Sequence, residues 1–197
     1  MNVRFVTGNV GKAAEAAATL APLGILFERV GLDLRHADVD GLEEVATAKA
    51  ESLRGQVAPP YFVEDAGLFI DALAGFPGVY SAYVFRTLGN HGILRLLHGE
   101  RQRGATFRAV VAYVSGKAAP RLFSGRCAGS VLEEPRGRNG FGFDPIFRPE
   151  GRRRSFAQME AAEKNARSHR GDAMRRFAAS FAPARRPMIR RASGRGP

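Results

Sequence analysis

The segment from Thr7 to Lys12, which reads TGNVGK, has the residue types and spacing of a phosphate-binding turn. It lies between a short β-rich run and an alanine-rich stretch of high helix propensity. Backbone N–H groups at the start of a helix, with a lysine nearby, bind anionic phosphate. The segment is not a Walker A loop, because its spacing is shorter and Ala13 follows the lysine. Taken alone, it is equally well interpreted as an ordinary turn with a surface lysine.

Glu64 and Asp65 form an acidic pair at the end of another β-rich run. Two adjacent carboxylates suit Mg²⁺, which takes a few hard oxygen ligands and keeps water and substrate phosphates as the others. One of the two could instead accept a proton from water. A solvated turn is the alternative for an acidic pair considered by itself.

Two glycine-rich segments carry aromatic residues. The segment 75–82, GFPGVYSA, could form the wall of a pocket, and the segment 140–147, GFGFDPIF, places Asp144 among aromatic rings. An aromatic face can stack on a purine, and glycines let the backbone approach a ligand closely. Each segment alone is also explained as a turn with apolar side chains.

Lys164, His169 and Arg170 lie close together near the end of the chain. Lysine, histidine and arginine that converge can bind phosphate or a purine carbonyl, although a solvated basic stretch has the same composition. The lysines sharpen this interpretation, because the chain has 26 arginines and only four lysines. Lys12, Lys49 and Lys164 lie in or beside the candidate segments, which indicates a need for a compact point charge there.

The elements that would position these residues alternate between strand and helix in the first half of the chain and include an antiparallel hairpin in the middle. The expected strands are Val3–Val6, Ile25–Val30, Tyr61–Glu64, Phe107–Ser115 and a pair at Arg121–Phe123 and Cys127–Leu132. The expected helices are Lys12–Leu23, Gly41–Arg54, Asn90–His98 and one or two over Ala157–Phe181. This order predicts a mixed α/β fold.

The totals are those of one ordinary globular domain. The chain has 197 residues, of which 45% are hydrophobic and 25% charged. The single Cys127 excludes an internal disulfide, and no Cys/His set has zinc spacing. The first residues lack the layout of a signal peptide, and the apolar runs are far shorter than the ~18 residues of a membrane span. A soluble cytoplasmic protein is therefore expected.

The net charge of +11 is concentrated at the end of the chain. Residues 182–197 contain five arginines and no acid, and without them the chain carries +6. Proline, glycine and like charges predict a disordered basic tail after a domain over residues 1–181. A basic tail can touch nucleic acid, but the rest of the sequence has no RRM, KH or helix-turn-helix signature, so nucleic-acid binding is the less favoured alternative.

Taken together, five ordered segments resemble the inosine triphosphate pyrophosphatase family. They are TGNVGK at 7–12, EEVATAKA at 43–50, VEDAGLFIDALAGFPGVYSAYV at 63–84, FGFDPIF at 141–147 and AEKNARSHRGDA at 162–173. The resemblance implies hydrolysis of ITP, XTP and dITP to the monophosphate and pyrophosphate, with Mg²⁺ as cofactor. It also implies an elongated mixed β-sheet flanked by helices, in two lobes with a central active-site cleft, and a homodimer.

The same resemblance implies roles for individual residues. Asp65 matches the proton acceptor and metal ligand, with Glu64 beside it as a second ligand. The substrate-binding set consists of the triphosphate turn Thr7, Gly8, Asn9, Val10, Gly11 and Lys12, then Lys49 and Ala66, the base-binding segment Phe141, Gly142, Phe143 and Asp144, the next contact Lys164, and the purine-reading pair His169 and Arg170.

Three positions depart from the family pattern. Ala66 stands where the family usually has Ser or Thr, and Gln158 where it often has Glu. A metal-ligand Glu is missing from the region before Glu44, where His36, Asp38 and Asp40 are the candidate replacements. The alternatives left open are a pyrophosphatase for other modified nucleotides, such as pyrimidines, and a relative that binds nucleotide without turnover.

Overall fold

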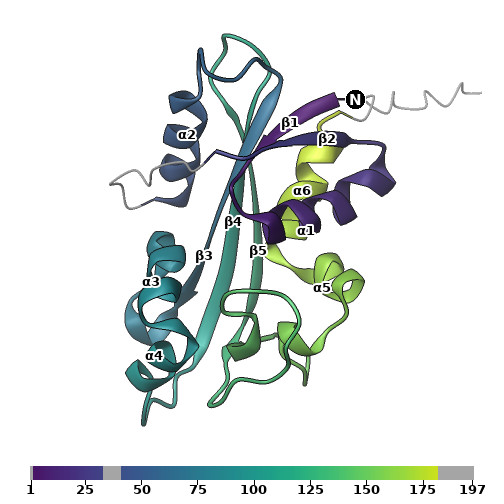
Figure 1. Ribbon diagram of the computed structural model, residues 1–197. Coiled ribbons are helices and arrows are strands. Elements are labelled where there is room, and N and C mark those ends of the chain that lie inside the picture. Colours follow the sequence, from purple (N-terminus) through teal and green to yellow (C-terminus); the bar gives the residue numbers. More distant parts are fainter. Residues whose placement is uncertain (1, 33–40, 182–197) are drawn as a thin grey trace, which may run out of the picture.

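The computed structural model describes residues 2–32 and 41–181. It contains a six-stranded mixed sheet, and helices cover both faces of this sheet (Figure 1). The strand order is β2-β1-β3-β4-β5-β6, with β2, β1 and β3 parallel and the remaining pairs antiparallel. The strands are β1 (Asn2–Val6), β2 (Leu26–Val30), β3 (Tyr61–Ile70), β4 (Gly104–Val114), β5 (Arg121–Val131) and β6 (Phe147–Pro149). The predicted mixed α/β fold is confirmed.

The helices divide between the two faces of the sheet. The helices are α1 (Val10–Leu20), α2 (Leu42–Ser52), α3 (Ser81–Thr87), α4 (Gly89–Leu96), α5 (Ala161–Arg167) and α6 (His169–Ala179). One core cluster joins α1 and α6 to one face around Phe5, Phe62 and Phe177, and a second joins α2 to the other face around Val45, Tyr61 and Val63. A third cluster, around Phe107 and Phe147, fills the far end of the long strands. No helix within the described residues is long and apolar enough to cross a membrane.

This topology predicts a ligand site where β1 and β3 separate, a position that we call the crevice. The connection from β1 to β2 runs through α1 on one face, and the connection from β2 to β3 runs through α2 on the other. In open α/β sheets, ligands bind outside the carboxyl end of a strand where successive connections leave for opposite faces. The pairing of β1 with β3 ends at Phe5↔Phe62. Beyond Phe62, the edge of β3 on the β1 side is not paired with β1 and faces the predicted ligand site.

Several elements are longer than the sequence suggested. The expected strand at Tyr61–Glu64 continues to Ile70, because β4 pairs with it residue by residue as far as Ile70↔Ala105. The two short strands expected at 121–123 and 127–132 form the single strand β5. Helix α3 was not expected, since it directly follows the proline- and glycine-rich turn at 75–78.

Candidate functional site

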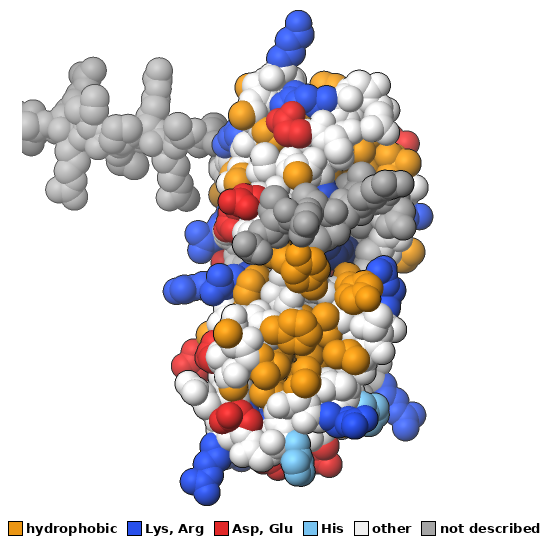
Figure 2. All heavy atoms as spheres, turned by 90° about the vertical axis from the view of Figure 1, so that its left-hand side faces the viewer, with side chains coloured by type: hydrophobic (Ala, Val, Ile, Leu, Met, Phe, Trp, Pro, Cys, Tyr) orange, Lys and Arg blue, Asp and Glu red, His pale blue; other side chains and the backbone are white. Residues whose placement is uncertain are grey.

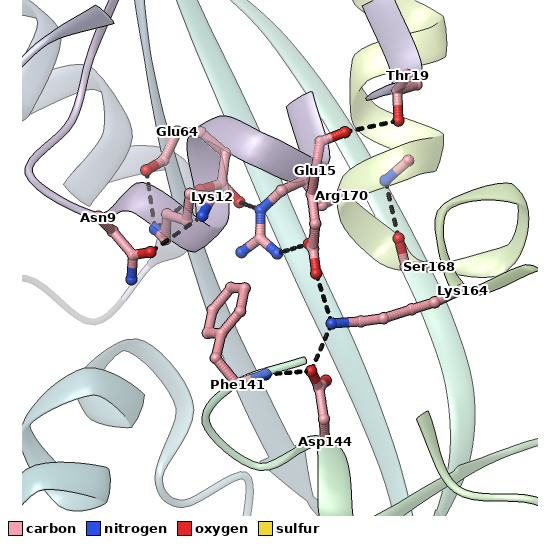
Figure 3. Close-up of polar contacts among 11 residues, drawn as sticks. Asn9, Lys12, Glu15, Thr19, Glu64, Phe141, Asp144, Lys164, Ser168 and Arg170 are labelled. Carbon is pink, nitrogen blue, oxygen red and sulfur yellow. Dashed lines mark hydrogen bonds and ion pairs between the residues drawn. The ribbon is translucent and has the colours of Figure 1, made fainter. Parts of the chain in front are cut away.

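Charged side chains from six separate segments form one continuous network at this position. Figure 3 shows the part of it that runs from Asp144 to Lys12. Carboxylates and cations alternate along it in the order Asp144, Lys164, Glu15, Arg170, Glu64, Lys12, Asp65 and Lys49. Buried charges are tolerated when each has partners of opposite sign, and this alternation meets that requirement. The network joins both predicted phosphate-chemistry segments to Asp144, Lys164 and Arg170, which were predicted to bind the base.

Lys12 stands at the start of α1, beside the open edge of β3. Its Nζ donates to the Glu64 carbonyl oxygen at 3.1 Å, and it lies 2.8 Å from Glu64 Oε2 and 3.8 Å from Asp65 Oδ1. The contact with Oε2 is an ion pair without hydrogen-bond alignment, because that oxygen accepts no hydrogen bond within the described residues. The lysine therefore links the helix start to both members of the acidic pair.

The turn before α1 leaves amides free at the helix start. Asn9 caps the helix by accepting from Lys12 N at 2.9 Å, and its own N–H donates to Thr7 Oγ1 at 3.1 Å. The N–H groups of Val10 and Gly11 find no acceptor in the described part of the chain. Unsatisfied N–H groups at a helix start, with the positive end of the helix dipole, attract an anion.

Glu64 and Asp65 point to opposite faces of β3 and differ in their surroundings. Glu64 is fully buried, and Arg170 Nε donates to its Oε1 at 3.1 Å. Burial alone would raise the pKa of Glu64, but the charges of Arg170 and Lys12 outweigh it and hold the pKa below its ordinary value. Asp65 accepts from Lys49 Nζ at 3.0 Å on the α2 side. Glu64 thus holds the cations in place, while Asp65 is the more accessible of the two carboxylates.

Glu15 connects the remaining cations and was not singled out from the sequence. Its Oε1 lies 2.5 Å from Lys164 Nζ and its Oε2 lies 2.5 Å from Arg170 Nη1. Lys164 Nζ also lies 2.5 Å from Asp144 Oδ2. The only signal in the sequence was an acid three residues after Lys12 in an otherwise alanine-rich helix, which also describes an ordinary solvated residue.

The segment 141–144 divides between site and core. The Phe141 ring lies over Lys164 Nζ at 5.0 Å and over the Arg170 guanidinium at 5.4 Å, and its N–H donates to Asp144 Oδ2 at 2.8 Å. Phe143 is buried in the far core cluster against Phe85, so its side chain is away from the network. Burial raises the pKa of Asp144 and outweighs the lowering effect of Lys164.

His169 is buried at the start of α6. Its ring stacks on Phe107 with centroids 4.5 Å apart, and Nδ1 has no hydrogen-bond partner within the described residues. Burial, followed by the positive charges of Arg170, Lys164 and Lys12, holds the pKa of His169 well below 6.5. The imidazole is therefore neutral at neutral pH, so one ring nitrogen can donate a hydrogen bond and the other can accept one.

Two further positions flagged in the sequence are explained locally. Ala66 is half-buried and packs against the core cluster around Phe5 and Phe62. Gln158 forms a capping box, in which its Oε1 accepts from Ser155 N at 3.0 Å, so its role is structural. His36, Asp38 and Asp40 lie outside the described residues.

The carboxylates fit Mg²⁺ in part. Within residues 2–32 and 41–181, no group of three or more His, Cys, Asp and Glu side chains could hold a metal ion. Mg²⁺ commonly needs only one or two protein carboxylates. Asp65, at the crevice, suits this use, whereas both oxygens of Glu64 face Arg170 and Lys12 in the interior.

Comparison with known proteins gives consistent matches over the described domain. The model of the Ham1 family matches residues 3–180. A protein named dITP/XTP pyrophosphatase from Thermococcus kodakarensis is 50% identical, with 90% of this chain and 96% of that protein covered. A protein of the same name from Methanopyrus kandleri is 51% identical, with 90% of this chain and 95% of that protein covered.

Solved structures agree with the sequence matches. The structure of a HAM1 protein from Coxiella burnetii has a TM-score of 0.80 at 30% identity and covers 91% of this chain and 98% of that one. A nucleoside-triphosphatase / dITP/XTP pyrophosphatase from Mycobacterium abscessus has a TM-score of 0.70 at 30% identity, with coverage of 92% and 98%. The resemblance seen in the sequence is thereby confirmed, and the chain belongs to the Ham1 family.

Proposed function

We propose that this chain is a nucleoside triphosphate pyrophosphatase that hydrolyses the deaminated purine nucleotides dITP, ITP and XTP to the monophosphate and pyrophosphate. Relatives about half identical to it carry the name dITP/XTP pyrophosphatase. The observation that carries the proposal is the charge network, which joins a helix-start anion site at Lys12 to the aromatic segment at Phe141. Clearance of these compounds acts on the free nucleotide pool, so we place the enzyme in the cytoplasm.

The reaction we propose is attack of water on the α-phosphorus with pyrophosphate as the leaving group. Asp65 orients the water and accepts its proton. Lys12 and Lys49, together with the free amides of Val10 and Gly11, offset the charge that develops on the pyrophosphate. Phosphoryl transfer of this kind depends mainly on positioning and electrostatics, which these residues supply.

We assign Mg²⁺ to Asp65. The neighbouring carboxylate, Glu64, fixes the side chains of Lys12 and Arg170. Bound at Asp65, the ion would supply positive charge to the phosphate oxygens. Lys49 holds Asp65 at 3.0 Å and keeps the carboxylate directed at the crevice.

Base selection in this proposal falls to His169 and Arg170, beside the Phe141 ring. Hypoxanthine and xanthine share a 6-oxo group, whereas adenine carries an amino group there. A buried site that hydrogen-bonds the oxygen leaves groups unpaired when adenine enters, and this costs binding energy. The neutral His169 with its free ring nitrogen is suited to such a hydrogen bond.

The test is pyrophosphate release from dITP, ITP, XTP, GTP, ATP and dUTP, with and without Mg²⁺. We expect turnover of the first three, dependence on Mg²⁺, and kcat/KM for ATP lower by at least about a hundredfold. Preference for dUTP would support the alternative of a pyrophosphatase for modified pyrimidines. Absence of pyrophosphate release from every nucleotide would reject catalysis and leave a nucleotide-binding relative.

We also propose that two copies of the chain associate through the face that carries α3 and α4. Figure 2 shows hydrophobic side chains gathered on the lower half of this face. The exposed large apolar residues of this segment are Phe76, Tyr80, Tyr83, Phe85, Leu88 and Leu96. Apolar patches of this kind mark association surfaces. Leu88→Arg should convert a dimer to a monomer in light scattering, whereas Leu26→Arg, at an exposed leucine on β2, should not.

A further inference from the structure

Gly11 of the phosphate-binding turn lies directly against the ring of Phe141. A Cβ atom placed on Gly11 would meet Phe141 Cδ1 at 2.7 Å and Cε1 at 2.9 Å. Real Cβ atoms do not approach other atoms this closely, so a side chain at position 11 and the present ring position exclude one another. The turn that precedes α1 and the segment 140–144 therefore touch at a point where only glycine fits.

The ring itself is fixed from several sides. Phe141 N donates to Asp144 Oδ2 at 2.8 Å, and Gly140 adopts a positive φ of 74° with that same carboxylate packed against it. Lys164 and Arg170 lie against the ring at 5.0 and 5.4 Å from its centroid. Figure 3 shows the ring projecting from its loop toward Lys12 and Arg170. Its position therefore sets the space between the anion site and the cations behind it.

The ring is the nearest neighbour of position 11, and the next is Asn9 Oδ1, the N-cap oxygen, which would lie 3.2 Å from a Cβ on Gly11. Gly11 is the second residue of α1, its φ is not positive, and any residue except proline would supply the same N–H. Glycine inside a helix is destabilising relative to alanine, so the choice has a cost in helix stability. What glycine provides is chiefly room for the ring and, to a smaller extent, room for Asn9 Oδ1.

We infer that Gly11 is a positioning residue for base recognition: it seats Phe141 against the start of α1 and thereby fixes the width of the crevice in which the purine lies. This inference rests on the proposed function. It assigns Gly11 an effect on the base-binding segment, in addition to the phosphate contact of its N–H group. A side chain at position 11 must displace the ring from Lys164 and Arg170.

The test is a double-mutant cycle with Gly11→Ala and Phe141→Ala, assayed with dITP. We expect Gly11→Ala to raise KM by about tenfold while kcat changes by less than about threefold, because the phosphate contacts and Asp65 remain. In the Phe141→Ala background, the same substitution should change KM by less than about twofold. Equal effects of Gly11→Ala on KM in the two backgrounds, or a loss confined to kcat, would overturn the inference.

Thermal unfolding of the same four proteins tests the contact without turnover. Alanine at position 11 should improve α1, but in the wild-type background it also displaces the ring. The rise in Tm should therefore be larger, by roughly 2–4 °C, in the Phe141→Ala background. Equal shifts would reject the contact even if dITP is hydrolysed. Coupled shifts without pyrophosphate release from the wild type would reject the proposed function and leave the contact intact.

Discussion

The buried charges of the crevice balance one another in number, and the exposure of each cation determines which of them an anion meets first. Four carboxylates face four cations, and each cation has at least one carboxylate within 3.1 Å. Arg170 and Lys164 are almost completely buried, whereas Lys12 and Lys49 keep some exposure at the crevice. A triphosphate would therefore meet the two partly exposed lysines first. The two buried cations, Arg170 and Lys164, would stay paired with their carboxylates.

Asp65→Asn keeps the shape of the side chain but removes its negative charge and its capacity to accept a proton. We expect turnover of dITP to fall by about a hundredfold or more, with an unchanged circular dichroism spectrum. Asp71→Asn, just beyond the far end of the same strand, is the control and should retain wild-type turnover. Near-normal turnover by Asp65→Asn would remove this residue from the mechanism.

The neutral state of buried His169 predicts a loss of stability in acid. Its pKa in the folded protein lies well below 6.5, so the unfolded chain binds the proton more readily. The contribution of the neutral imidazole to the free energy of unfolding is complete above pH 6.5. It is lost as the pH falls from there toward the pKa of His169 in the folded protein. The fall in Tm between pH 7.5 and 5.5 should be smaller for His169→Gln than for the wild type. His91→Gln, at an exposed position on α4, is the control, and an identical slope in all three proteins would contradict the assignment.

Individual residues show where inference from the sequence reaches its limit. Lys12, Lys164 and Arg170 were all expected at a site, and the structure joins them in one network. Glu15 was missed because nothing in an alanine-rich helix reveals that its outward face meets two cations from α5 and α6. Phe143 was grouped with Phe141 by sequence adjacency, but the turn directs the first ring to the crevice and the second to the core.

Strand β3 illustrates how an element is held where one of its edges has no strand beside it. Ser81 Oγ accepts from Leu68 N at 2.8 Å and donates to the Gly78 carbonyl oxygen at 2.7 Å. A Cβ on Gly67 would lie 2.1 Å from that carbonyl oxygen, so this glycine permits the turn to lie against the strand. The Leu68 N–H on the β3 edge is satisfied in this way without a neighbouring strand.

Gly67→Ala should therefore destabilise the protein, because the atom that it would strike is backbone and cannot move aside cheaply. We expect the free energy of unfolding to fall by about 1–3 kcal/mol in urea denaturation. Gly116→Ala is the matched control, since a Cβ there meets no atom within 4 Å. A variant as stable as the control would show that the turn at Gly78 can shift.

The order of elements was predictable because periodicity and turn residues are local signals, but their lengths were not. Glu64 and Asp65 suggested the end of a strand because acids disfavour a buried sheet, yet Lys12, Arg170 and Lys49 neutralise them there. Similarly, the glycines of β5 suggested an interruption. Gly125 instead admits the backbone of α6, with the His169 carbonyl oxygen 2.2 Å from an ideal Cβ. Tertiary contacts of this kind are not visible in a single sequence.

The folded domain should end near Phe181, before the basic end of the chain. Phe181 is the last described residue, and it packs on the core cluster of α1 and α6. We propose from composition that residues 182–197 form a separate tail that lies outside the described residues. Its deletion should change Tm by less than about 2 °C and leave dITP hydrolysis unchanged.

The same deletion should weaken binding to a polyanion such as heparin, because it removes five arginines and counterion release scales with the number of cations. Elution from heparin at a lower salt concentration is the measurement. A Tm lower by several degrees, or a change from dimer to monomer, would contradict the separate tail and favour the alternative that Met188 and Ile189 anchor it on a second copy of the chain.

The uninterrupted pairing of β3, β4 and β5 has a consequence for motion. β4 is paired on both sides along nearly its whole length, from Gly104↔Ser130 to Tyr61↔Val114. The two ends of the molecule are therefore connected by a continuous ladder, and the crevice can widen only if this ladder twists. In amide hydrogen exchange, the N–H groups of β4 should open only with the entire protein, whereas those of Val10 and Gly11 should exchange rapidly until a nucleotide occupies the helix start.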